Sequence, residues 1–158
     1  MKKVLVTGGA GFIGGNFIRY YLEAHPDSQI INLDNLTYAG NPDSIKDIEE
    51  HPSYRFVKGD IGDRILVSKL FQDKIDVVVN FAAESHVDRS IDGPGEFIQT
   101  NIFGTYNLLE LAKKYWIQLE ADKKVDFRFH HISTDEVYGD LPHPDDYQEL
   151  SARPDADS

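Results

Sequence analysis

An adjacent pair of acidic residues, Asp135 and Glu136, follows a strand-like run at residues 127–132. Thr134 stands directly before the pair, so a hydroxyl and two carboxyls come together where one element ends. In an open α/β sheet, ligands bind in the crevice beyond the carboxyl ends of the strands. Two close carboxyls in a dry pocket cannot both ionise freely, and a protonated acid beside a carboxylate suits general acid–base chemistry. The alternative is that the pair only caps the next turn.

A glycine-rich loop, TGGAGFIG at residues 7–14, lies between an expected strand and an expected helix. Its glycines fit two forms of the dinucleotide-binding pattern, G-x-G-x-x-G at Gly9, Gly11 and Gly14 and G-x-x-G-x-x-G at Gly8, Gly11 and Gly14. Glycine allows a tight turn, backbone access to a pyrophosphate and close approach of the helix to the strand. The N-terminus of the helix then offers free N–H groups to the phosphates.

Asp34 follows the second expected strand and stands 20 residues after Gly14. A carboxylate at this position accepts hydrogen bonds from ribose hydroxyls and repels a 2′-phosphate, which favours NAD over NADP. The alternative is a solvated turn residue in Asp34-Asn35. Asp60 and Ile61, after the third expected strand, are candidates for contacts to the edge of adenine, although Asp60 is also typical of a turn.

Strands and helices alternate along the chain. The expected strands are 3–7, 29–33, 54–58, 75–81 and 127–132, and the expected helices are 10–24, a short one from Asn41-Pro42 towards Glu50, 65–71 and 97–119. This order predicts an α/β fold, a Rossmann-type doubly wound parallel sheet with right-handed crossovers. Residues 1–140 are assigned to this domain. Residues 141–158 are acidic and contain three prolines, so we expect a loop or disorder there.

The composition excludes several classes of partner. The chain has 158 residues, a net charge of −11 and no cysteine. Nucleic-acid backbones and anionic membranes would repel such a surface, and disulfides and thiolate metal sites are ruled out. No apolar run has the length of a signal peptide or a membrane-spanning helix, so the cytoplasm is the expected location.

The expected helix at 97–119 has two apolar stripes. One stripe contains Ile98, Ile102, Leu109, Ala112 and Trp116, and the other contains Leu108, Leu111, Tyr115 and Leu119. One stripe can pack on the sheet, and the second needs another partner. That partner is either later chain or a second copy, which would make a homodimer through this helix.

Several longer motifs carry a family resemblance: TGGAGFIGG, DNLTYAGN, FAAESHVDRS, TNIFGTYNLLE and HISTDEVYGD. Over residues 3–143 the chain resembles the extended short-chain dehydrogenase/reductase superfamily and, within it, the N-terminal part of the dTDP-glucose 4,6-dehydratases. The resemblance implies NAD as cofactor and a dTDP-sugar as substrate. The residues implied for NAD are Gly8, Gly11, Phe12, Ile13, Gly14, Asp34, Asn35, Leu36, Thr37, Asp60, Ile61, Phe81, Ala82, Ala83, Ser85 and Thr100, and the resemblance implies that the whole segment 81–85 lies along the cofactor. Ser85 and Thr134 are implied to face the sugar nucleotide.

The resemblance also implies the chemistry. NAD oxidises the sugar at C4, water is eliminated across C5 and C6, and the hydride returns to C6. Glu136 is implied as the base at C5, Asp135 as the acid for the leaving hydroxyl, and Thr134 as a hydrogen-bond partner of the C4 oxygen. The related sugar-nucleotide 4-epimerases eliminate no water and resemble this chain without the acid pair, so a dehydratase is preferred. A non-enzymatic NAD-binding fragment is the other alternative.

One catalytic motif of that superfamily is absent from the 158 residues. Its oxidation step uses a tyrosine and a lysine in Y-x-x-x-K on a helix beyond the acid pair. Only Tyr54 and Lys58 have this spacing, and they lie in an expected strand, where four residues span roughly 13 Å. The expected fold is therefore truncated before the last strands and the substrate domain. We expect these residues alone to be inactive and at best weak NAD binders.

The histidines do not predict a metal site. His130 and His131 are adjacent in an expected strand, so they face opposite sides and cannot chelate one ion together. His86, after the fourth expected strand, is the third candidate. Satisfied or solvated imidazoles are the preferred interpretation of all three, and no metal is expected.

Overall fold

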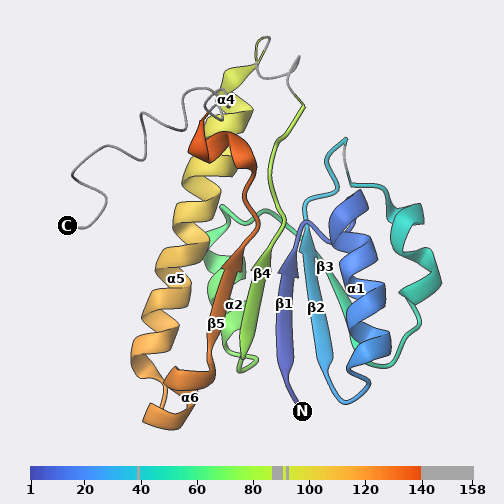
Figure 1. Ribbon diagram of the computed structural model, residues 1–158, viewed down its shortest axis with the longest axis vertical. Helices are drawn as coiled ribbons and strands as arrows, with labels where there is room; N and C mark the ends of the chain where they lie inside the picture. The colour runs from blue at the N-terminus through green and yellow to red at the C-terminus, as the bar shows by residue number, and fades with distance from the viewer. Residues whose placement is uncertain (39, 87–90, 92, 140–158) are drawn as a thin grey trace, which may run out of the picture.

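The computed structural model describes residues 1–38, 40–86, 91 and 93–139. Within them, five parallel strands form one sheet in the order β3-β2-β1-β4-β5 (Figure 1). The strands are β1 (Lys3–Thr7), β2 (Gln29–Asp34), β3 (Tyr54–Lys58), β4 (Val77–Asn80) and β5 (Arg128–His131). The predicted α/β class and parallel sheet are confirmed. The proposed tail at 141–158 lies outside the described residues.

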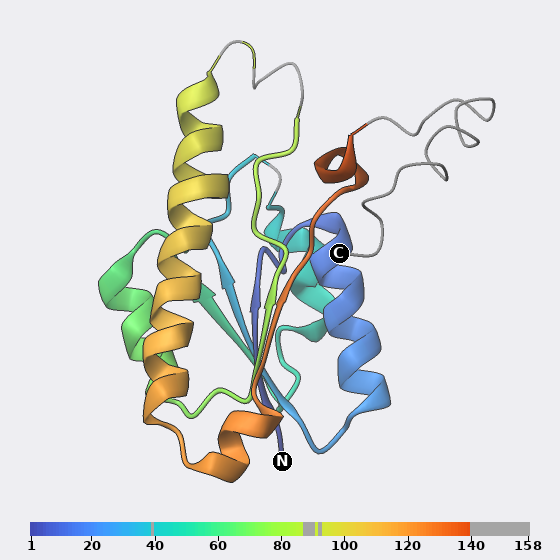
Figure 2. The ribbon, with the colours of Figure 1, turned by 60° about the vertical axis from the view of Figure 1, so that its left-hand side comes forward.

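The sheet is covered on both faces, as Figure 2 shows. Helices α2 (Arg64–Phe71) and α5 (Thr105–Gln118) pack on one face, and α1 (Phe12–Ala24) and the 3₁₀ segment η1 (Pro42–Ile48) pack on the other. Successive residues of β1 alternate between the two cores: Leu5 faces α2 and α5, whereas Val4 and Val6 face α1 and η1. Burial of both faces explains why β1 and β4 are continuous apolar runs in the sequence.

The long helix expected at 97–119 has three parts. A short helix α4 (Pro94–Phe97) continues through a π-helical segment η2 (Ile98–Gly104) into α5, and a separate helix α6 (Ala121–Asp126) follows. The sequence pattern gave no sign of the π segment. Gly104 allows this part to lie close to the loop after β3, because a Cβ there would be 2.8 Å from Ile61 Cγ1.

Only one of the two apolar stripes packs on the sheet. Leu108 and Leu111 are buried against the sheet and α2, and so is Ala112, which had been assigned to the other stripe. The remaining members of that other stripe are exposed: Ile98, Ile102, Leu109 and Trp116. Among the described residues, Lys124 of α6 contacts Trp116, and the other three side chains stay about half exposed.

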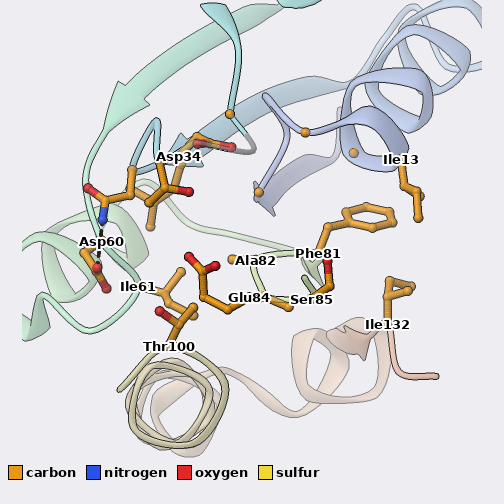
Figure 3. A pocket seen from close by; sticks show the side chains of 18 of the residues that line it. Ile13, Asp34, Asp60, Ile61, Phe81, Ala82, Glu84, Ser85, Thr100 and Ile132 are labelled. Atoms are coloured by element: carbon orange, nitrogen blue, oxygen red, sulfur yellow. Dashed lines mark hydrogen bonds between the residues drawn. The ribbon is translucent and has the colours of Figure 1, made fainter. Parts of the chain in front are cut away.

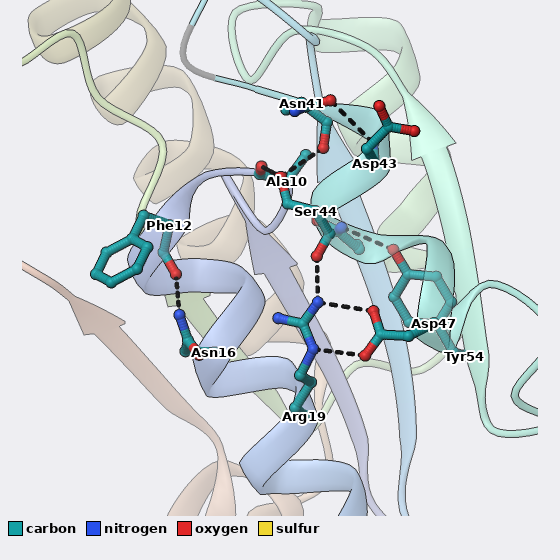
Figure 4. Close-up of polar contacts among 10 residues, drawn as sticks. Ala10, Phe12, Asn16, Arg19, Asn41, Asp43, Ser44, Asp47 and Tyr54 are labelled. Atoms are coloured by element: carbon teal, nitrogen blue, oxygen red, sulfur yellow. Dashed lines mark hydrogen bonds and ion pairs between the residues drawn. The ribbon is translucent and has the colours of Figure 1, made fainter.

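Polar contacts fix η1 against α1 and the glycine loop (Figure 4). The Arg19 guanidinium donates two hydrogen bonds of 2.7 Å to the Asp47 carboxylate and a third to the Ser44 carbonyl. This hydrogen bonding raises the pKa of Arg19 and lowers the pKa of Asp47. The Ser44 hydroxyl donates to the Ala10 carbonyl at 3.1 Å, and the Asn41 side chain caps η1.

Tyr54 belongs to the core. It is 8% exposed at the amino end of β3, its hydroxyl accepts a hydrogen bond of 2.9 Å from Asn32, and burial raises its pKa. It therefore cannot act as the tyrosine of a Y-x-x-x-K pair, as the sequence analysis concluded. None of the described helices is long and apolar enough to cross a membrane.

Candidate functional site

The glycine loop lies directly against the end of β4. Gly8 has a φ of +72°, which favours glycine, and its N–H donates to the Leu33 carbonyl at 3.0 Å. A Cβ on Gly8 would be 2.6 Å from the Ala82 backbone nitrogen. The loop can therefore pass between the ends of β2 and β4 only without a side chain at this position.

Two further glycines lie where a Cβ would collide, Gly14 with backbone atoms and Gly9 with buried side chains. A Cβ on Gly14 would collide with the Gly8 carbonyl and would lie 2.8 Å from the Gly9 Cα. A Cβ on Gly9 would collide with Asn32, whose side chain accepts a hydrogen bond of 3.1 Å from the Gly9 N–H. Gly11 precedes α1 without a side-chain cap. The N-terminus of α1 therefore borders the cavity, and its free N–H groups form a site suited to an anionic group.

Asp34 lines the cavity and also holds the glycine loop in place by a hydrogen bond. Its carboxylate accepts a hydrogen bond from the Ala10 N–H and another from the Leu36 N–H, both of 2.8 Å, and the residue is 7% exposed. Its link to a ribose, expected from the sequence, stays a prediction. A carboxylate with two backbone partners still has acceptor capacity for a ligand hydroxyl.

A cavity of about 470 Å³ collects the predicted cofactor residues at the carboxyl ends of the strands (Figure 3). Those that line it are Gly8, Gly11, Phe12, Ile13, Gly14, Asp34, Asn35, Thr37, Asp60, Ile61, Phe81, Ala82, Ala83, Ser85 and Thr100. Leu36 is the one predicted cofactor residue that is not among the lining residues; it instead gives its N–H to Asp34. Ile132, Ser133 and Thr134 complete the wall on the β5 side.

Glu84 also lines the cavity, within the segment 81–85 that the resemblance implies for NAD. A second hollow, of about 290 Å³, adjoins the cavity and is also lined by Glu84, together with Asn35, Thr37, Asp60 and Thr100. Glu84 therefore lies where the two hollows meet.

The segment after β4 is held by the π segment. The Asn101 side chain accepts a hydrogen bond from the Glu84 N–H and donates one to the Glu84 carbonyl, each of 2.8 Å. Asn101 lies within η2. π-helical turns often occur at functional sites, and here the turn carries a carboxamide that satisfies both backbone groups of one pocket residue.

A chain of polar contacts joins three strands beneath the cavity. The Thr7 hydroxyl of β1 donates to the Asn80 side chain of β4, and the Asn80 amide donates to His131 Nδ1 of β5 at 3.0 Å. His130 and His131 are both exposed. His131 therefore has a structural partner, and the described residues contain no cluster of three or more potential metal ligands.

Thr134 and the acid pair lie beyond β5. Thr134 lines the cavity with Ser85 and Ser133, so the two residues expected to face a sugar share one wall region. Asp135 and Glu136 begin a short 3₁₀ segment, η3 (Asp135–Tyr138). The structure describes their backbone, and the positions of their carboxyl groups are outside what it describes.

A doubly wound parallel sheet with a glycine loop at the switch between β1 and β4 defines a Rossmann-type fold, a class in which dinucleotides bind at such a switch. Residues 5–154 match the family described as GDP-mannose 4,6 dehydratase, and the chain belongs to that family.

The chain is similar to dTDP-glucose 4,6-dehydratases and, at lower identity, to a sugar-nucleotide 4-epimerase. The dTDP-glucose 4,6-dehydratase of Salmonella typhimurium is 56% identical over 147 residues, which cover 92% of this chain and 40% of the relative. The solved dTDP-glucose 4,6-dehydratase of Streptomyces venezuelae, with NAD bound, has a TM-score of 0.77 and 45% identity over 89% of this chain and 42% of its own. A UDP-Glc/GlcNAc 4-epimerase of Campylobacter jejuni has a TM-score of 0.76 and 31% identity, covering 91% of this chain and 40% of its own. The chain thus spans about 40% of the length of the dTDP-glucose 4,6-dehydratases that it matches.

Replacing Gly14 by alanine is expected to destabilise the protein by about 1–3 kcal/mol, because the new methyl group collides with the backbone of the glycine loop. Urea unfolding measures the change. Gly95→Ala is the matched control, since no atom lies within 4 Å of its added Cβ, and a helical alanine there is expected to be neutral or stabilising. Equal midpoints for Gly14→Ala and the wild type would contradict the close packing.

Replacing Asn101 by aspartate is expected to cost about 1–3 kcal/mol of stability, because a carboxylate cannot donate to the Glu84 carbonyl and leaves that group unpaired. Asn16→Asp is the control: Asn16 is exposed and bonds only the Phe12 carbonyl one turn earlier, so a change within about 0.5 kcal/mol is expected. The same urea-unfolding measurement compares the two variants. An Asn101→Asp protein as stable as the control would show that the two Asn101 hydrogen bonds do not hold the segment after β4 in place.

Proposed function

We propose that this chain supplies the NAD-binding part and the elimination residues of a dTDP-glucose 4,6-dehydratase. The observation that carries the proposal is the cavity that joins the N-terminus of α1 to Thr134 at the carboxyl edge of the sheet. The identity of about 55% to dTDP-glucose 4,6-dehydratases supports this specificity within the family.

The residues that line the cavity fit a dinucleotide. The bare backbone at Gly8 and Gly14 and the uncapped N-terminus of α1 suit a pyrophosphate, which needs N–H donors at close range. Asp34 is assigned to the adenosine ribose, and Asp60 and Ile61 to the adenine. The end of the cavity at Ser85 and Thr134 is then left for the nicotinamide and the sugar.

Bound NAD would accept a hydride from C4 of the sugar and return it to C6. The acid pair performs the step between these transfers. The C4 ketone acidifies the proton on C5; Glu136 removes that proton, and Asp135 gives a proton to the hydroxyl that leaves C6 as water. Thr134 holds the C4 oxygen by a hydrogen bond. The overall change is dTDP-glucose to dTDP-4-keto-6-deoxyglucose and water.

The acid pair favours this activity over that of a 4-epimerase. The fold does not separate the two, since the Campylobacter jejuni epimerase has nearly the same TM-score as the Streptomyces venezuelae dehydratase. An epimerase removes and returns hydrogen at C4 and has no leaving hydroxyl to protonate. Two adjacent carboxyls after Ser133-Thr134 match the extra needs of an elimination.

The 158 residues by themselves are expected to bind NAD and not to turn over dTDP-glucose, because they contain no helical Tyr-x-x-x-Lys pair to oxidise C4. Incubation with NAD and dTDP-glucose, followed by an assay of the keto sugar, tests turnover. Calorimetry tests binding. Binding without turnover supports the proposal. Turnover at an ordinary enzymatic rate would show that the Tyr-x-x-x-Lys pair is not needed for C4 oxidation. Absence of NAD binding contradicts the assignment of the cavity.

The same calorimetry tests the role of Asp34. NAD is expected to bind about tenfold or more tightly than NADP, because the Asp34 carboxylate repels a 2′-phosphate. Asp34→Asn is expected to bring the ratio towards one, whereas Asp43→Asn, an exposed acid on η1, is expected to leave it unchanged. An Asp34→Asn protein that still binds NAD tenfold more tightly than NADP would show that the Asp34 charge does not cause the preference.

We further propose that the exposed stripe of η2 and α5 binds a second copy of the chain. Its large apolar side chains are 41–61% exposed: Ile98, Ile102, Phe103, Tyr106, Leu109, Trp116 and Ile117. A helix surface with this many exposed apolar side chains is typical of an interaction site. A second copy related by a twofold axis would present the same apolar side chains and would therefore complement them.

Light scattering coupled to gel filtration tests the dimer. Leu109→Glu places a charge in the middle of the stripe and is expected to shift the protein from dimer to monomer. Gln72→Glu adds the same charge at the exposed end of α2 and is expected to leave the dimer intact. A wild-type protein that is monomeric at high micromolar concentration would contradict the proposal.

A further inference from the structure

Asn107 is a buried polar side chain of α5 that bonds the loop between β3 and α2. The residue is 7% exposed, and its Nδ2 donates a buried hydrogen bond of 2.7 Å to the carbonyl oxygen of Ile61, 46 residues away in the sequence. A buried carbonyl that loses its donor costs free energy, so the loop has a reason to keep this arrangement. Asn107 lines neither hollow, and the proposed reaction does not use it.

The bond from α5 holds one end of a peptide group whose other end holds an acid of the cavity. The carbonyl of the peptide between Ile61 and Gly62 accepts from Asn107. The N–H of the same peptide donates to the Asp60 carboxylate at 2.6 Å. Because a peptide group is planar, the direction of its carbonyl sets the direction of its N–H. Asn107 therefore acts on the Asp60 carboxylate through this peptide.

The Asn107 carboxamide is itself held in one orientation. Its Oδ1 accepts a hydrogen bond of 3.3 Å from the Arg64 guanidinium, which also contacts the Glu110 carboxylate at 2.8 Å. Gly104, about one turn before Asn107, lets the helix lie close to the loop, since a Cβ there would be 2.8 Å from Ile61 Cγ1. The amide N–H of Asn107 therefore points to the loop and its oxygen to Arg64.

We propose that Asn107 is a positioning residue that fixes the Asp60 carboxylate in the orientation in which it accepts a hydrogen bond from the adenine amine. This inference rests on the proposed function, which assigns Asp60 and Ile61 to the adenine. Figure 3 shows these two residues on the same side of the cavity. The two Asp60 oxygens accept from the Gly62 N–H and the Asn35 side chain, and each oxygen keeps capacity for a further donor.

The preference for ADP over IDP measures the orientation of this carboxylate. The 6-amino group of adenine is a donor, whereas hypoxanthine carries an oxygen there, which a carboxylate repels. Calorimetry gives both affinities for the wild type and for Asn107→Asp, which keeps the shape but offers the Ile61 carbonyl no donor. The wild type is expected to bind ADP about tenfold or more tightly than IDP, and the variant is expected to lower this ratio about threefold or more. The ratio of NAD to NADP affinity, which is assigned to Asp34, is expected to stay unchanged.

A double-variant cycle separates positioning from a general loss of structure. Asp60→Ala lacks the carboxylate, so adding Asn107→Asp to it is expected to lower the base preference no further. A purely structural role would weaken ADP and IDP binding equally and leave their ratio unchanged. Gln118→Glu makes the same change from amide to carboxyl at an exposed position near the end of α5, and this control is expected to keep the wild-type ratio. If Asn107→Asp does not fold, Asn107→Ala, which lacks the donor and suits a helix, replaces it throughout.

The inference is supported by a lowered ADP-to-IDP ratio with an unchanged NAD-to-NADP ratio and no further loss in the Asp60→Ala background. It is overturned by a variant at Asn107 that keeps the wild-type base preference, by an equal fall in both ratios, or by a further loss in the Asp60→Ala background. Failure of the wild type to bind NAD and ADP would overturn the proposed function and this inference with it. A wild type that binds NAD but does not distinguish ADP from IDP would overturn this inference and leave the NAD site in place.

Discussion

The close approach of the glycine loop to the end of β4 is the contact on which the rest of the site depends. Gly8 adopts a positive φ and lies where a Cβ would touch the Ala82 backbone, so the loop packs between β2 and β4 without a side chain. Asp34 then secures the loop through the Ala10 N–H. These contacts place the N-terminus of α1 at the point where the order of the strands reverses, which is where open α/β sheets bind ligands.

The chain offers N–H groups rather than cations to an anionic cofactor. Its net charge is −11, and the described residues lining the cavity include no lysine, arginine or histidine. Backbone N–H groups and the dipole of α1 can bind phosphate within such a surface, because they act over the short distance of a hydrogen bond. The acidic side chains are then free to select for ribose hydroxyls and against an additional phosphate.

The two halves of the cavity are held by different means. On the side proposed for adenosine, loop backbones are fixed by Asp34, at the end of β2, and by Asp60, after the neighbouring β3. On the β4 and β5 side, the chain Thr7–Asn80–His131 aligns the strand ends, and Asn101 fixes the segment that carries Glu84 and Ser85. The residues proposed for elimination follow β5, so their placement depends on the sheet, whereas the residues proposed for the cofactor depend on the loops.

The sequence alone determined the sheet, the glycine loop, Asp34 and the position of the acid pair, because these follow from local patterns: buried strands, a required backbone conformation and fixed spacing. It did not predict the π segment, which of the two helix stripes is buried, or the hydrogen bonds of Asn101 to the backbone of Glu84. Each of these depends on contacts between residues far apart in the chain, such as Gly104 with Ile61 and Asn101 with Glu84. Periodicity shows that a helix has apolar faces, and only the folded chain decides which face is buried and which polar groups find partners.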